Sequence, residues 1–131
     1  MKCIDLFSGC GGLSLGFEKS GFEVVAAFEY WEPAIEVYKN NFTHPIFNQD
    51  LTNEQEAIEK IRMFSPDLIM GGPPCQDFSS AGKRDITQGR ADLTYHFAIF
   101  FCAIKPKWFV LESFVQSKKI NFFGDFLHWS Y

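Results

Sequence analysis

Apolar residues along this chain gather in short runs separated by amphipathic or glycine-bounded segments. The runs predict five buried strands, at 2–7, 22–29, 45–48, 67–72 and 107–113. The segments between them predict four helices, at 11–21, 32–42, 52–64 and 91–105. Strands that alternate with helices through short loops are typical of a doubly wound, mostly parallel α/β sheet.

The polar and glycine-rich stretches follow this pattern closely. "SGCGG", "EYWE", "NQDL", "GGPPCQ" and Glu112 each stand at the carboxyl end of a predicted strand. In open parallel sheets these ends meet at one edge, where ligands bind. The sequence therefore predicts one functional site at that edge.

Composition narrows the class of protein. The chain has 131 residues, 47% hydrophobic, which is enough for one domain with a real core. No apolar run approaches the roughly 20 residues of a membrane span, and no secretory signal is recognisable, so we expect a soluble intracellular protein. The net charge of -4 gives no sign of nucleic-acid binding, which must be inferred from motifs or lie on other sequence.

The four cysteines have no CxxC spacing, so we expect reduced thiols and no metal site. Cys3 and Cys102 stand in apolar runs and are expected in the core. Cys10 and Cys75 stand in glycine- or proline-rich loops and need separate explanations.

The first loop has features of a nucleoside-cofactor site. Gly9, Gly11 and Gly12 allow close backbone approach at a helix start, although they do not form a regular G-x-G-x-x-G. Glu29 follows about 20 residues later, where an acid commonly binds ribose hydroxyls. A purely structural turn, a dinucleotide site and an adenosyl site all remain compatible with these residues.

Three further residues at this edge have two interpretations each. Tyr30 or Trp31 could stack on an adenine ring or pack in the core. Asp50 could accept a hydrogen bond from an adenine amino group or belong to the helix cap around Thr52.

The stretch "GGPPCQDFS" points to chemistry. Two prolines stiffen the loop and fix the direction of the Cys75 thiol, whereas an inert cysteine is more common inside a strand. At the sheet edge, a thiolate would serve as a nucleophile facing the same crevice as the glycine turn.

The stretches "DLFSGCGGLSLGFEKSGF", "GGPPCQDFSSAGK" and "GRADLTYHF" together resemble the DNA cytosine-C5 methyltransferases, in order and spacing. The resemblance extends to Glu112 and implies a Rossmann-like, S-adenosylmethionine-dependent methyltransferase fold. It implies that Cys75 attacks C6 of a flipped-out cytosine and that Glu112 acts at N3 and the amino group of that base. The methyl group of S-adenosylmethionine would then pass to C5.

The resemblance also assigns the remaining site residues. The implied cofactor-binding positions are Phe7, Gly9, Gly11, Leu13, Glu29, Tyr30, Asp50, Leu51, Pro74 and Leu93. The implied contacts to DNA or to the flipped base are Gln76, Ser79 and Arg90.

Two departures from the family stand out. The usual Glu-Asn-Val of the fifth strand end is Glu112-Ser113-Phe114, and the aromatic segment 115–131 does not resemble the family continuation. We therefore expect residues 1–114 to be the cofactor-binding and catalytic half of a methyltransferase domain, with an incomplete sheet, an atypical tail and no target-recognition domain. A frameshifted gene and one subunit of a split enzyme both remain compatible.

The expected function is a bacterial, cytoplasmic DNA methyltransferase fragment of restriction-modification type, acting on double-stranded DNA through a missing or separate recognition domain or complementing subunit. The alternative is an inactive remnant that binds only S-adenosylmethionine or a partner. A nicotinamide-dependent half-domain is disfavoured by the Pro-Pro-Cys-Gln stretch. An incomplete parallel sheet exposes an edge and an apolar face, so we expect marginal stability or self-association.

Overall fold

A computed structural model of the chain describes residues 1–74 and 93–112. All nine expected elements are present within these residues. They are β1 (Lys2–Leu6), α1 (Gly12–Lys19), β2 (Glu23–Glu29), α2 (Glu32–Asn41), β3 (Ile46–Asn48), α3 (Glu54–Arg62), β4 (Leu68–Gly71), α4 (Leu93–Ile104) and β5 (Trp108–Leu111). The predicted boundaries are confirmed to within a few residues.

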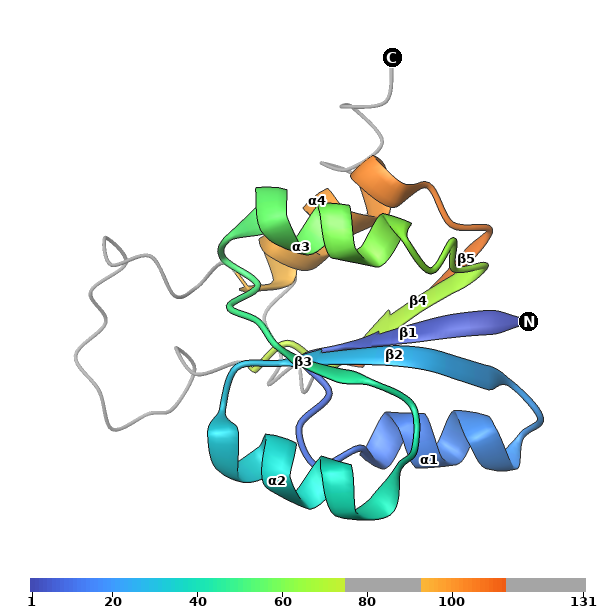
Figure 1. Cartoon of the computed structure of the whole chain (residues 1–131). Coiled ribbons are helices and arrows are strands. Elements are labelled where there is room, and N and C mark those ends of the chain that lie inside the picture. The colour runs from blue at the N-terminus through green and yellow to red at the C-terminus, as the bar shows by residue number, and fades with distance from the viewer. Residues whose placement is uncertain (75–92, 113–131) are drawn as a thin grey trace, which may run out of the picture.

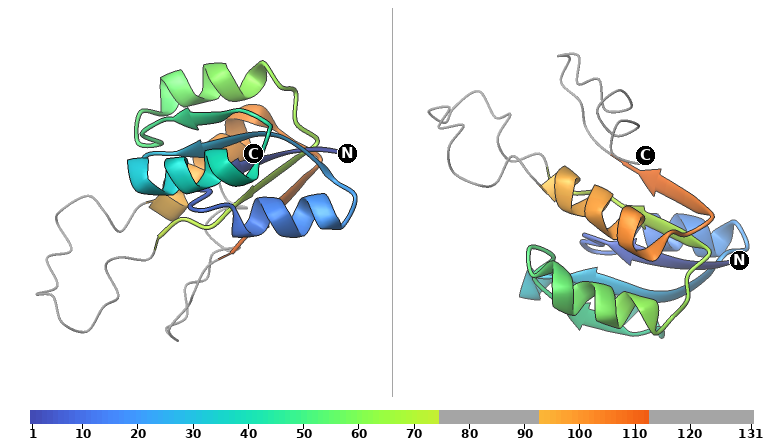
Figure 2. Two further views of the ribbon diagram at one scale, coloured as in Figure 1. Left: turned by 60° about the horizontal axis from the view of Figure 1, so that its bottom comes forward. Right: turned by 90° about the horizontal axis from the view of Figure 1, so that it is seen from above.

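The strands form one parallel sheet in the order β3-β2-β1-β4-β5. Helices α1 and α2 lie below the sheet in Figure 1, and α3 and α4 lie above it. This arrangement follows from right-handed crossovers, because the direction of strand addition reverses between β3 and β4. The views of Figure 2 show the same three layers, and the predicted doubly wound α/β fold is confirmed.

The larger core lies between the sheet and the pair α3 and α4. It is made by the upper-face residues of the central strands together with apolar side chains of both helices: Ile4, Leu6, Ala26, Phe28, Leu51, Ala57, Ile61, Ile69, Phe97 and Phe100. Nearly continuous apolar strands are expected where helices cover both faces of a parallel sheet.

A smaller core lies under α1. Cys3, Val24, Leu68 and Met70 form it, and side chains of α1 and of the turn before β2 pack against it. The expected burial of Cys3 is confirmed, and burial raises the pKa of its thiol to about 12.

The expected burial of Cys102 is wrong, because this residue is exposed. Helix α4 is apolar around most of its circumference, yet only Phe97 and Phe100 are fully buried. The run of apolar residues therefore predicted the helix correctly but did not show which of its sides faces the core.

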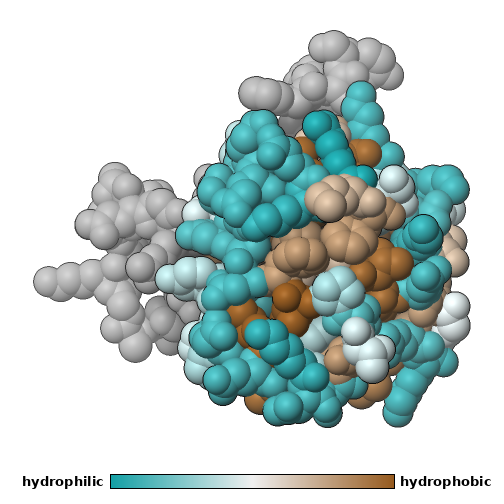
Figure 3. Space-filling view, viewed as in Figure 1, coloured by the Kyte–Doolittle hydropathy of each residue, from teal (hydrophilic) through white to brown (hydrophobic). Residues whose placement is uncertain are grey.

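Hydrophilic side chains cover the outer faces of α2 and α3, and a band of apolar surface runs between these helices over the edge strand β3 (Figure 3). None of the helices within residues 1–74 and 93–112 has the length and hydrophobicity needed to cross a membrane.

Candidate cofactor and catalytic site

The loop between β1 and α1 is a strained turn. Phe7, Gly9 and Gly11 all have positive φ, of 56°, 53° and 96° respectively. A Cβ atom on Gly11 would lie 2.3 Å from Phe42 Cε2 and 3.0 Å from Tyr38 Cε2. Only glycine fits at Gly11, because any side chain there would collide with the Phe42 and Tyr38 rings, so the turn packs closely against the end of α2.

Glu29 ends β2 beside this turn. Its Oε2 accepts a hydrogen bond of 2.8 Å from the Gly9 N–H, and its Oε1 accepts from the N–H groups of Tyr30 and Trp31, both at 2.8 Å. Three backbone donors therefore hold the carboxylate in one orientation. The structure brings together the two features, glycine turn and acid, that the sequence suggested.

The neighbouring aromatic and acidic residues are open to ligands. Tyr30 and Trp31 are 68% and 63% exposed, so the core-packing interpretation of Trp31 is wrong. Asp50 Oδ1 accepts hydrogen bonds from the Thr52 N–H at 2.9 Å and the Thr52 Oγ–H at 2.7 Å. These two bonds lower the pKa of Asp50. The local-cap interpretation of Asp50 thus describes one of its oxygens.

The remaining apolar cofactor candidates differ in exposure. Leu51 is only 3% exposed and packs in the larger core. Leu13 and Leu93 are partly buried at the first residues of α1 and α4, and Phe7 packs partly against the larger core. If Leu51 has a role at the site, it would therefore be to support the site by packing in the larger core.

Glu112 stands just beyond β5, where its N–H donates to the Gly71 carbonyl at 2.9 Å. Its carboxylate lies against Gly72, because a Cβ atom built there would be 2.8 Å from Glu112 Oε2. Pro74 follows and is exposed. The candidate acid thus lies beside the strand end that leads into the cysteine loop. Cys75, Gln76, Ser79 and Arg90 lie outside the described residues.

A buried polar chain beneath the glycine turn was missed by the sequence reasoning. Asp5 Oδ2 lies 2.7 Å from Ser14 Oγ, which is 2.6 Å from the Tyr38 hydroxyl, which is 2.6 Å from His44 Nε2. His44 Nδ1 lies 3.1 Å from Glu18 Oε1. The sequence did contain one signal of this buried polar chain, because Asp5 is a charged residue inside the apolar run "KCIDLF".

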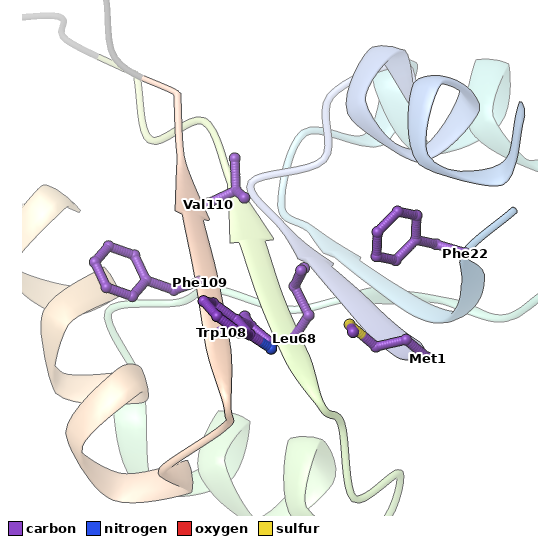
Figure 4. A pocket seen from close by; sticks show the side chains of 6 residues that line it. All are labelled: Met1, Phe22, Leu68, Trp108, Phe109 and Val110. Atoms are coloured by element: carbon purple, nitrogen blue, oxygen red, sulfur yellow. The ribbon is translucent and has the colours of Figure 1, made fainter. Parts of the chain in front are cut away.

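An apolar groove lies between α1 and β5. Its wider part has a volume of about 540 Å³ and is lined by Gly12, Leu13, Gly16, Phe17, Ser20, Phe22, Leu68 and Val110. Figure 4 shows the adjoining part, where Met1, Phe22, Leu68, Trp108 and Val110 gather and Phe109 points the other way, toward α4. Trp108 is 60% exposed.

Among the residues that the structure describes, no three His, Cys, Asp or Glu side chains come together as possible metal ligands.

Comparison with known proteins agrees with this geometry. The family model of the C-5 cytosine-specific DNA methylases matches residues 1–119. The Type II methyltransferase M.HindV of Haemophilus influenzae is 70% identical over 98% of this chain, which spans 42% of that protein. M.HgiGI of Herpetosiphon aurantiacus is 56% identical over 90% of this chain, which spans 94% of that protein.

Solved structures show the same fold. A prophage-encoded Escherichia coli protein, described as a DNA modification methyltransferase, has a TM-score of 0.75 at 33% identity over 95% of this chain, which covers 35% of it. The DNMT2 of Spodoptera frugiperda has a TM-score of 0.72 at 28% identity over 97% of this chain, and 40% of that protein is covered. The chain therefore has an incomplete Rossmann-like methyltransferase fold and belongs to the C-5 cytosine-specific DNA methylase family.

Proposed function

We propose that this chain is the cofactor-binding and catalytic half of a restriction-modification DNA methyltransferase, which transfers a methyl group from S-adenosylmethionine to C5 of cytosine. The observation that carries the proposal is the glycine turn with Glu29 clamped beside it, at the same sheet edge as Glu112. The alternative, an inactive remnant that only binds the cofactor or a partner, is separated from it by the experiment below.

The described residues fit an adenosyl cofactor. A carboxylate held by backbone N–H groups suits two ribose hydroxyls, and the exposed ring of Tyr30 suits one face of adenine. At Gly9 an added Cβ would meet nothing within 4 Å, so the backbone of the turn is open there to the close approach of the methionine part. Asp50 at the next strand end keeps Oδ2 for an adenine amino group, because both hydrogen bonds that its carboxylate accepts within residues 1–74 and 93–112 use Oδ1.

S-adenosylmethionine, when bound, supplies an electrophilic methyl group on sulfur. In the proposed reaction the Cys75 thiolate forms a bond to C6 of an extruded cytosine, and electron density moves to C5 and N3. The Glu112 carboxyl, in its protonated form, donates a hydrogen bond or proton at N3 and so stabilises that density. As C5 takes the methyl group, the cofactor sulfur would keep the bonding electron pair, and S-adenosylhomocysteine would be the leaving group. C5 then loses its proton to a base, the C5–C6 double bond re-forms, the Cys75–C6 bond breaks, and the thiolate returns.

We also propose that a further polypeptide segment completes the domain. The chain spans 42% of M.HindV, so that relative contains more sequence than this chain matches. In the groove between α1 and β5, the edge-strand residues Trp108 and Val110 are 60% and 37% exposed, which suits a packed segment from the same or another chain. Double-stranded DNA would be bound mainly through such additional sequence, in the bacterial cytoplasm.

The first test is calorimetric titration of the 131-residue chain with S-adenosylmethionine. Glu29→Gln should weaken binding at least tenfold, because it removes the anionic acceptor of the ribose hydroxyls. Glu32→Gln is the matched control, since Glu32 lies on the exposed start of α2 and bonds to Asn48 instead. Equal binding by both variants would refute the cofactor site.

The second test adds the part of M.HindV that this chain does not match and measures methylation of DNA. Activity that Cys75→Ser abolishes and Cys10→Ser retains would support catalysis. Cofactor binding without methylation in the reconstituted mixture would favour the inactive remnant.

A further inference from the structure

We propose that Asp5, Ser14, Tyr38 and His44 act as positioning residues for the cofactor turn, through one hydrogen-bonded chain that is complete only at one proton content. The inference rests on the proposed cofactor site, since it concerns the turn that would contact the ligand. None of these four residues is among the site residues identified from the sequence.

The hydrogen-bonded chain of Asp5, Ser14, Tyr38 and His44 connects the elements that surround the turn. Asp5 belongs to β1, Ser14 to α1, Tyr38 to α2, and His44 to the loop before β3. Asp5 and Ser14 stand on opposite sides of the turn in sequence, so their contact closes it at its base. The Tyr38 and Phe42 rings, 4.3 Å apart between centroids, then press directly against Gly11.

Because the hydrogen-bonded chain is buried, its stability depends on how many hydrogens its members carry. Asp5, Ser14 and Tyr38 are all 0% exposed, and the His44 side chain is 10% exposed. Asp5 Oδ1 has no hydrogen-bond partner within the described residues. A buried carboxylate with one oxygen unpartnered is costly when ionised, which favours the neutral acid.

The hydroxyls of Ser14 and Tyr38 carry one hydrogen each, so all links must point in one direction. With Asp5 protonated, Asp5 donates to Ser14, Ser14 to Tyr38, and Tyr38 to His44 Nε2. The remaining hydrogen on His44 Nδ1 then faces the Glu18 carboxylate at 3.1 Å. Four hydrogens satisfy four contacts without a charge on Asp5 or His44.

Removing or adding a proton breaks a link. With three hydrogens, Asp5 is ionised, every link reverses, and a bare His44 Nδ1 faces the Glu18 carboxylate. With five, His44 and Tyr38 point hydrogens at each other along their 2.6 Å contact. Passing the proton of Asp5 along the chain to His44 keeps the count at four but separates charge inside the core, which burial disfavours.

The pKa values of the end groups agree with the neutral state. Burial raises the pKa of Asp5 to about 7. Hydrogen bonds from the hydroxyl and the backbone N–H of Ser14 oppose this shift, and the nearby Glu29 carboxylate adds to it. Burial lowers the pKa of His44, while its contact with Glu18 opposes that effect. Tyr38 faces Asp5, Glu18 and Cys3, and burial raises the pKa of both Tyr38 and Cys3, so these two remain neutral.

The hydrogen-bonded chain should therefore hold the turn best in the pH range above the lowered pKa of His44 and below about 7. At pH 8 only about one molecule in ten keeps Asp5 protonated, so affinity for S-adenosylhomocysteine should fall up to about tenfold. On the acidic side, affinity should fall again as His44 gains a second proton. The expected profile is a bell.

The test measures S-adenosylhomocysteine affinity by calorimetry from pH 5.5 to 8.5. Asp5→Asn supplies a neutral donor in place of the protonated acid, and should abolish the alkaline fall while keeping the acidic one. Tyr38→Phe keeps the ring on Gly11 but cuts the chain, and should weaken and flatten the profile. Ser20→Ala is the control, because it removes a hydroxyl at the end of α1 that donates to the Gly16 carbonyl and, within the described residues, takes no part in the hydrogen-bonded chain. Parallel pH profiles of Tyr38→Phe and the parent chain would overturn the proposal.

Nuclear magnetic resonance of the ligand-free chain separates failure of this proposal from failure of the cofactor site. With labelled Asp and His, we expect protonated Asp5 and the Nδ1–H form of His44 at pH 6.5. The amide signals of Gly9 and Gly11 should titrate together with Asp5. An ionised Asp5 at pH 6.5, or Gly9 and Gly11 signals that do not shift as Asp5 titrates, would refute the proposed hydrogen-bonded chain even if the cofactor binds. If nothing binds but these signals titrate as described, only the cofactor site fails.

Discussion

Replacing the glycines of the first loop one at a time tests the packing beneath the cofactor turn. Gly11→Ala should be the most damaging of three otherwise equal changes. At φ 96° a side chain costs about 1–2 kcal/mol, because Cβ meets the backbone in left-handed conformations. The new Cβ would also lie 2.3 Å from Phe42 Cε2 and 2.8 Å from Phe42 Cζ. Overpacking of this kind typically adds about 1–3 kcal/mol.

Two neighbours provide matched controls. Gly9 also has positive φ, but a Cβ there meets nothing within 4 Å, so Gly9→Ala should cost only the backbone term of about 1–2 kcal/mol. Gly12 begins α1, has no positive φ and faces open space, so Gly12→Ala should be neutral or stabilise by up to about 1 kcal/mol.

Urea denaturation of the free chain measures all three, with unchanged m-values as the check that the same transition is compared. Adding Phe42→Leu to Gly11→Ala should recover part of the loss, giving a double variant more stable than the sum of its parts. Equal destabilisation by Gly9→Ala and Gly11→Ala would show that Phe42 yields freely, and the argument from close packing would then be wrong.

Three further outcomes are expected. The pKa of Asp5 lies above its unfolded value of 3.8, so its favourable contribution is complete below pH 3.8 and is lost as pH rises to about 7. Relative to Asp5→Asn, the unfolding free energy should therefore fall by about 4 kcal/mol over that range, measured by denaturant titration at several pH values; a constant difference would contradict the neutral acid. Val110→Lys, in the groove, should reduce self-association in sedimentation experiments, whereas Met63→Lys, at a side chain that is 82% exposed and does not line the groove, should not. His96→Ala should destabilise the chain by about 1 kcal/mol, because the 2.6 Å contact of His96 Nδ1 with Glu54 Oε1 joins α4 to α3; no loss would show that the contact is idle in solution.

The elements were predictable because their signals are local. Pro33 near a helix start, Gly21 after a helix and β-branched residues in 22–29 each act within a few positions of the chain. The site edge was predictable too, because parallel strands force their carboxyl ends together whatever the tertiary details.

Contacts between distant elements were not predictable. Nothing local to Tyr38 indicates that its hydroxyl meets Ser14, which is 24 residues away. The clamp of three N–H groups on Glu29 likewise depends on how the turn and strand end meet in space. Cys102 was misjudged, and core packing of Trp31 stayed open, for a related reason: an apolar residue type does not show which side of an element faces the core.

The strand order has a consequence for how the chain folds during synthesis. β1, β2 and β3 with their two helices are complete by residue 48, so this half can assemble while the rest is still being made. Until residues 68–71 emerge, however, the open side of β1 has no partner, although β1 becomes the central strand. The central strand β1 is thus synthesised first and its neighbour β4 much later. Between these two times the edge of β1 is unpaired, so we expect chaperones to bind mainly in that interval.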